Sequence, residues 1–141
     1  MLALLLILTT CGMPRDIEHT TEDVEERGYI RAGAVARAAD PSSLDGGSPA
    51  GYEADLVTGY AESLGVDVQW EVGSEGELMT ALEEGALDIV VGGIESSSPW
   101  SKLVGLSAPI SPQGAPHLVA AVRQGENRWL LGFERYVDGR R

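Results

Sequence analysis

Apolar residues recur along the chain at two different spacings. Leu56, Tyr60 and Leu64 lie four residues apart, the spacing of one face of a helix, which predicts a helix over 52–64 that a glycine ends. Directly after it, apolar and polar residues alternate over 66–72, which predicts a strand with one face in solvent, as at the edge of a sheet. The switch from one period to the other indicates an α/β fold.

The same patterns predict six further elements. A short helix within 20–28 has Thr21 as its N-cap, and Ser74 with Glu77 forms a capping box at the start of another helix, which Gly85 ends. Apolar runs with few polar residues predict buried strands. The remaining expected elements are strands within 29–35, 87–93 and 117–122 and a last helix over 126–137.

Strands separated by helices of this length imply right-handed crossovers and a mainly parallel sheet. With the strand over 66–72 at the edge, the expected order is 2-1-3 plus a C-terminal return strand, in a single three-layer α/β/α domain. Ligands in such sheets bind beyond the carboxyl ends of the strands, where the strand order reverses. The loops that meet there are 36–50 and 93–100, and both are rich in small and polar residues.

The second of these loops has the composition of a contact loop for a small molecule. Gly92 and Gly93 let another group approach the backbone, the serines at 96–98 offer hydroxyl groups, and Trp100 offers an apolar face and an indole N–H. The alternative is an ordinary strand-to-helix turn, in which a serine caps the segment that Pro99 begins. Both interpretations stay open.

Charge narrows the range of partners. The chain has 141 residues and a net charge of −12, and no Lys or Arg occurs from Ala38 to Ser101. A nucleic-acid partner is not expected, because phosphate binding needs clustered cations. The simpler interpretation of the acidic balance is a solvated surface that keeps the protein soluble.

The N-terminus resembles an export signal. Leu2 to Leu8 is an unbroken apolar run, far shorter than the roughly 20 residues that span a bilayer. The sequence Leu-Thr-Thr-Cys that ends at Cys11 resembles a bacterial lipobox, whose cysteine carries the lipid anchor. The alternative is a cleaved signal with an incidental cysteine. The expected organisation is a signal peptide over 1–11, a tether over 12–20 and one lobe over 21–141.

Motifs of catalysis are missing from the sequence. His19 and His117 have no neighbours at metal-ligand spacing, and the chain contains no G-x-S-x-G, P-loop or G-x-G-x-x-G motif. We therefore expect no enzyme activity, no cofactor and no metal site.

Three stretches together resemble a known family. They are "GYIRAGAV", "GYEADLVTGYAESLGVDVQW" and "ELMTALEEGALDIVVGGIESSSPWSKLVGLSAPI", and the resemblance covers roughly 27–109. They are similar to the extracellular solute-binding proteins of ABC transporters, family 3, which have a type 2 periplasmic-binding fold. The resemblance implies a bacterial envelope protein that captures a small solute and presents it to an ABC permease. The ligand contacts it implies are Ala36, Arg37, Tyr52, Gly92, Gly93, Glu95, Ser96, Ser97 and Trp100.

The chain also departs from this family. Family members have two lobes, whereas here Pro109 and Ile110 are followed by the short stretch 111–116 and the expected return strand, so only the first lobe is expected. Glu95 stands where the family often has Ser or Thr, and Trp100 stands where amino-acid binders place an arginine. The resemblance then implies a neutral or cationic ligand, such as an amino acid or amine, with Glu95 as counter-charge and Trp100 as a cation–π platform.

Two alternatives to transport remain at this point. The lobe could serve a sensory or structural envelope lipoprotein as an interaction module, and this domain also occurs fused to lysozyme-like lytic enzymes. Exposed apolar surface around Ile110 would indicate a homodimer or a partner that supplies the second lobe.

Overall fold

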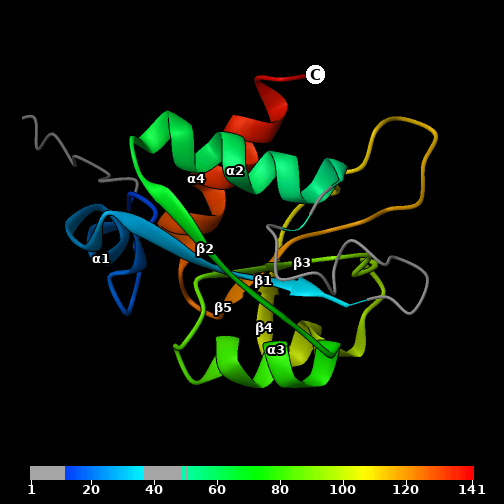
Figure 1. The fold of residues 1–141 in the computed structure, drawn as a ribbon, viewed down its shortest axis with the longest axis horizontal. Coiled ribbons are helices and arrows are strands. Elements are labelled where there is room, and N and C mark those ends of the chain that lie inside the picture. The colour runs from blue at the N-terminus through cyan, green and yellow to red at the C-terminus, as the bar shows by residue number, and fades with distance from the viewer. Residues whose placement is uncertain (1–11, 37–48, 50) are drawn as a thin grey trace, which may run out of the picture.

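A five-stranded sheet of order β2-β1-β3-β5-β4 divides the molecule into three layers (Figure 1). The computed structural model describes residues 12–36, 49 and 51–141. The helical segments are α1 (Thr20–Arg27), α2 (Tyr52–Leu64), α3 (Glu75–Glu83), the 3-10 helix η2 (Pro99–Lys102) and α4 (Asn127–Asp138). The strands are β1 (Tyr29–Val35), β2 (Asp67–Gly73), β3 (Ile89–Val91), β4 (Val104–Leu106) and β5 (Ala121–Arg123).

The strand directions confirm the expected topology. β1 pairs in parallel with β2 and with β3, while β5 is antiparallel to both β3 and β4. The predicted order 2-1-3 with a return strand is therefore correct, and β2 lies at the sheet edge. The return strand begins later than predicted, at Ala121 rather than at 117. The sequence analysis did not predict β4, the outer strand next to β5.

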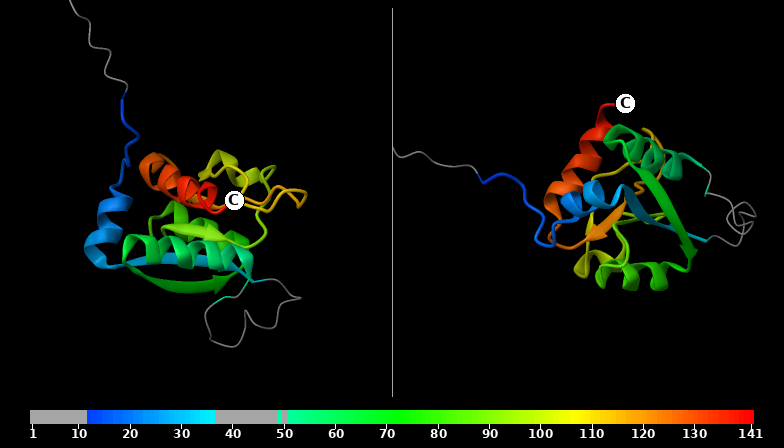
Figure 2. Two further views of the ribbon diagram at one scale, coloured as in Figure 1. Left: turned by 90° about the horizontal axis from the view of Figure 1, so that it is seen from above. Right: turned by 60° about the vertical axis from the view of Figure 1, so that its left-hand side comes forward.

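One face of the sheet is covered by α2 and α4, and the other by α3, as Figures 1 and 2 show. Trp129 and Phe133 of α4 are fully buried, and the Tyr60 ring of α2 packs against both at inclined angles, with ring centroids 5.3 and 5.5 Å apart. Burial raises the pKa of Tyr60 to about 12. The α3 side has its own core, built on Leu78 and Leu82.

The predicted capping box at α3 is present. The Ser74 hydroxyl accepts from the backbone N–H of Glu77, and the Glu77 carboxylate accepts from the backbone N–H and the hydroxyl of Ser74. These hydrogen bonds lower the pKa of Glu77, the largest cause being the one from the serine hydroxyl. The strong N-terminal cap fixes α3 directly after the edge strand.

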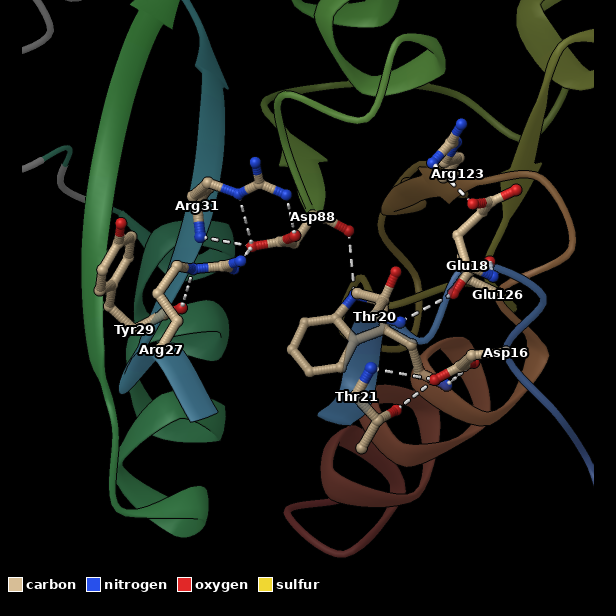
Figure 3. Close-up of polar contacts among 11 residues, drawn as sticks. Asp16, Glu18, Thr20, Thr21, Arg27, Tyr29, Arg31, Asp88, Arg123 and Glu126 are labelled. Carbon is tan, nitrogen blue, oxygen red and sulfur yellow. Dashed lines mark hydrogen bonds and ion pairs between the residues drawn. The ribbon is translucent and has the colours of Figure 1, made fainter. Parts of the chain in front are cut away.

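Two buried carboxylates hold the N-terminal segment against the lobe (Figure 3). Glu126 is 1% exposed and accepts from the backbone N–H groups of Glu18 (2.7 Å) and Thr20 (3.0 Å). Asp16 accepts from the backbone N–H of Trp129 (2.8 Å) and from both the N–H and hydroxyl of Thr21. The tether expected over 12–20 is therefore wrong from Asp16 onward. Thr21 is also not the N-cap, because α1 begins at Thr20 and His19 occupies that position.

A third buried carboxylate joins β3 to β1 (Figure 3). Asp88 is 3% exposed and accepts from Arg27 Nη2 (2.5 Å), Arg31 Nη2 (2.8 Å) and the Arg31 backbone N–H (2.7 Å). The hydrogen bond to Asp88 raises the pKa of Arg31 above its ordinary value. Because Trp129 Nε1 donates to the Asp88 carbonyl (2.9 Å), this residue also ties the sheet to α4.

Several expectations fall outside the described residues. These are the signal peptide over 1–11 with the lipid-anchor candidate Cys11, and the part of the first ligand loop that contains Arg37. Among the helices of the described chain, none combines the length and the apolar character that crossing a membrane requires.

Candidate functional site

The carboxyl ends of β1 and β3 lie next to each other, where the sequence predicts a ligand. Ala34 of β1 is in register with Val91 of β3, so the residues that follow each strand leave the sheet side by side. Ala36 continues β1 and donates its backbone N–H to the carbonyl of Gly73 at the end of β2 (2.8 Å). The structure thus places Gly92 against Val35, the residue before Ala36, as expected for neighbouring strand ends at a switch point.

The two glycines that follow β3 bind a side chain that sequence reasoning missed. The backbone N–H of Gly92 donates to Glu53 Oε1 (3.3 Å), and that of Gly93 donates to Glu53 Oε1 (3.2 Å) and Oε2 (2.9 Å). Glu53 lies in the first turn of α2, beside Tyr52, which is 45% exposed. The sequence shows only that Glu53 is an acid in the first turn of a helix. Acids are common there because they interact favourably with the helix dipole, so this position does not predict which group Glu53 binds.

Glycine is required at the first of these positions. Gly92 has φ 125°, and a Cβ placed there would lie 2.7 Å from the backbone nitrogen of Val35. Gly93 has φ 74°, also in the region that favours glycine. The close approach that the sequence predicted for this pair is made by the chain itself, between the ends of β3 and β1.

The next residues pair with the segment that leads into β5. Glu95 bridges to Leu118, and the backbone N–H of Ser96 donates to the carbonyl of His117 (3.0 Å). Glu95, Ser96 and Ser97 are all exposed. Their backbone is therefore held while their side chains face solvent, which leaves these polar groups available to a ligand.

The last part of the loop follows the simpler alternative of a capped turn. The Ser98 hydroxyl accepts from the backbone N–H of Trp100 (3.3 Å) and caps η2, which Pro99 begins. Trp100 is half-buried and packs against the core on the α3 side. A structural role therefore accounts for Ser98 and for part of the Trp100 ring, and the cation–π platform stays a prediction.

The point where a second lobe was expected to begin is closed. Ile110 is 1% exposed and donates its backbone N–H to the carbonyl of Leu118 (2.8 Å), while the Ser111 hydroxyl accepts from the backbone N–H of Leu118 (3.3 Å). A turn follows, in which Ala115 N–H donates to the Pro112 carbonyl (3.1 Å). Ile110 itself therefore offers no exposed apolar surface of the kind that would have indicated a partner.

A cavity of about 990 Å³ lies elsewhere, between α1, α2, α4 and the N-terminal segment. Its lining charges cancel: they are Arg15, Arg128 and Arg135 against Asp16, Glu22 and Glu25. Asp16 already binds backbone donors, and Glu22 pairs with Arg128. The lining is therefore neutral overall, and the edge of the sheet remains the better candidate. Within 12–36, 49 and 51–141, no cluster of three or more His, Cys, Asp or Glu side chains is placed to hold a metal ion.

Comparison with known proteins decides the family. Residues 30–130 match the model of the bacterial extracellular solute-binding proteins, family 3. The chain belongs to this family. A curated relative, the membrane-bound lytic murein transglycosylase F of Vibrio campbellii, is 29% identical over 97 residues, which are 68% of this chain and 18% of the relative. The chain thus spans about a fifth of the length of that relative.

Similar solved structures include single lobes. Domain 1 from TmArgBP, in its arginine-bound form, has a TM-score of 0.72 and 22% identity, covering 83% of this chain and 97% of that one. An ancestral cationic amino acid solute-binding protein has a TM-score of 0.71 and 15% identity, covering 85% of this chain and 93% of that one. These likenesses confirm the fold as one lobe of a periplasmic-binding protein.

Proposed function

We propose that the chain is a single-lobe binding module that takes a cationic amino acid or amine at the carboxyl edge of β1 and β3. The observation that carries the proposal is the loop after β3, in which residues 95–97 are exposed. Its residues 92–100 include one acid, Glu95, and no Lys or Arg, and its backbone is fixed by the bridge to Leu118. Glu53 adds a second carboxylate at the same edge. A cationic group bound there has two partners of opposite charge.

The structural neighbours support the choice of ligand class. One is domain 1 from TmArgBP in its arginine-bound form. The match covers 97% of that domain and 83% of this chain, so the two are similar in length. Another is named as a binder of cationic amino acids. The first of these supports the idea that one lobe can hold a solute without a second wall.

The setting of this activity is part of the same proposal. The family name places its members outside the cell. Lipidation of Cys11 would hold the lobe at the membrane surface, in the periplasm or on the outer face, where it could pass its solute to an ABC permease. In this role the chain binds without catalysing a reaction.

Calorimetry on the full chain tests the binding. We expect heat of binding with L-arginine and putrescine and none with L-glutamate. Glu95→Gln should weaken arginine binding by roughly tenfold, because it removes one charge-assisted contact. Glu84→Gln, which removes an exposed charge at the end of α3, is the matched control and should leave the affinity unchanged. A preference for glutamate that survives Trp100→Ala would refute the proposal.

The name of the curated relative favours a second candidate. A module related to part of a murein transglycosylase could be an interaction domain in the envelope rather than a transport component. Co-sedimentation with purified murein sacculi distinguishes the two. Binding to sacculi without any response to amino acids or amines would support the interaction module over solute capture.

A further inference from the structure

The backbone N–H groups of Gly92 and Gly93, here called the amide pair, form a site for an anion. Both residues have positive φ, and their successive N–H groups converge on one carboxylate. The occupant is Glu53, whose Oε1 and Oε2 both accept from Gly93. The protein therefore supplies its own carboxylate at this position.

Because of where the amide pair lies, its contact with Glu53 affects which ligands can bind. The pair follows β3 at the edge where the proposed solute binds, two residues before Glu95. A solute carboxylate that approached the amide pair would have to displace Glu53 and would meet a like charge. We infer that Glu53 is a specificity-determining residue, which excludes ligand carboxylates from the amide pair and favours amines without a carboxylate. For the identity of the ligand, this inference rests on the function proposed above.

Two features distinguish Glu53 from an ordinary surface acid. Glu53 is partly buried, whereas Asp55 in the same helix turn is exposed. The Glu53 carboxylate also binds residues that lie 39 and 40 positions further along the chain. The Asp55 backbone N–H continues the helix by donating to Gly51 (2.9 Å). Asp55→Ala is thus a matched control that removes the same charge from the same turn and leaves the amide pair filled.

The first test follows the amide resonances of Gly92 and Gly93 in the full chain by NMR. Sodium acetate is titrated against sodium chloride at equal ionic strength. In Glu53→Ala both resonances should move and saturate, with an acetate affinity at least about tenfold above that of the wild type. Wild type and Asp55→Ala should show no saturable shift. The absence of a shift in Glu53→Ala, or an equal shift in the wild type, would overturn the inference.

Two further variants strengthen this test. Glu53→Gln keeps an acceptor oxygen in place without the charge, so the amide pair should stay filled and acetate should not bind. Glu53→Ser cannot reach the glycines and suits the start of a helix, so it replaces Glu53→Ala if that variant does not fold. Far-UV circular dichroism checks the fold of each variant before titration.

The second test compares arginine with agmatine, which differs from arginine by lacking the carboxylate. Wild type should bind agmatine at least as tightly as arginine, whereas Glu53→Ala should prefer arginine by about tenfold. An unchanged ratio in Glu53→Ala would overturn the role in specificity. If acetate shifts the glycine amides of the variant but neither solute binds the wild type, the proposed function fails while the assignment of the amide pair to Glu53 stands.

Discussion

Replacement of Asp88 by asparagine tests how β3 is held beside β1. The carboxylate is 3% exposed and accepts three guanidinium hydrogen bonds, at 2.5, 2.8 and 3.4 Å, and one backbone hydrogen bond, at 2.7 Å. The asparagine side chain is equal in size, but its amide group would present donors to Arg27 and Arg31, which have only donors to offer. Each hydrogen bond to a charged group is worth about 1.5–3 kcal/mol, and breaking a buried ion pair costs about 3–5 kcal/mol.

The exposure of the two arginines decides where in the range of about 3–5 kcal/mol the loss of stability should fall. Their side chains are 21% and 33% exposed, so both can regain water when the carboxylate is lost. We therefore expect Asp88→Asn to lower the free energy of unfolding by about 3 kcal/mol, out of a total of about 5–15 kcal/mol for a domain.

Urea unfolding followed by circular dichroism measures this loss, with the slope m checked for constancy. Glu22→Gln is the matched control, because it removes the carboxylate of the Arg128–Glu22 pair, whose side chains are 49% and 47% exposed. That change should cost less than about 1 kcal/mol. If Asp88→Asn lowers the free energy of unfolding no more than this control does, the buried carboxylate does not stabilise the fold as argued.

Three further changes probe other contacts. Gly92→Ala should cost about 2 kcal/mol or more in urea unfolding, since it places a Cβ 2.7 Å from a backbone nitrogen at a positive φ, and a neutral result would contradict that geometry. Glu126→Gln removes one of the two acceptor oxygens and should accelerate hydrogen exchange at the Glu18 and Thr20 amides by about tenfold. Unchanged exchange would show that Glu126 does not hold the N-terminal segment. The folded-state pKa of Glu77 is lowered, so its stabilising contribution is present above its ordinary pKa of 4.5 and is lost as pH falls through the folded-state value. Thermal melts of Glu77→Gln and wild type should therefore differ at neutral pH and converge in acid, and a constant difference would refute this interpretation.

Local patterns predicted the elements whose cause is local. The four-residue repeat ending at Leu64 placed α2 within the bounds that the structure has, and the apolar run from Tyr29 placed β1. The capping box at Ser74 is likewise a contact between residues three apart. In each case the physical cause lies within one helix turn or one strand, so the sequence contains all of it.

Contacts between distant residues could not be predicted in this way. The start of α1 depends on Glu126, which lies 106 residues from Thr20, and the amide pair depends on Glu53, 39 residues from Gly92. β4 is only three residues long, too short to show a period. The Ser98 cap is local, since its partner Trp100 lies two residues away, and the sequence offered it as one of two interpretations. The packing of Trp100 against the core on the α3 side depends on distant residues and could not be predicted.

The closed turn at 111–116 has a consequence for how a solute can bind. Ile110 is buried and the turn is tied to Leu118, so the lobe completes its own core and its edge remains open on one side. A solute held from one side loses less water than one enclosed by two lobes, so burial contributes less to its affinity and charge contributes more. Interactions between groups that stay in contact with solvent are screened by salt, with a Debye length of about 10 Å at 0.1 M. We therefore expect arginine affinity to fall severalfold when sodium chloride is raised from about 0.02 to about 0.2 M in calorimetry, and more weakly in Glu95→Gln. An affinity that does not depend on salt would mean that burial, and not charge, holds the solute.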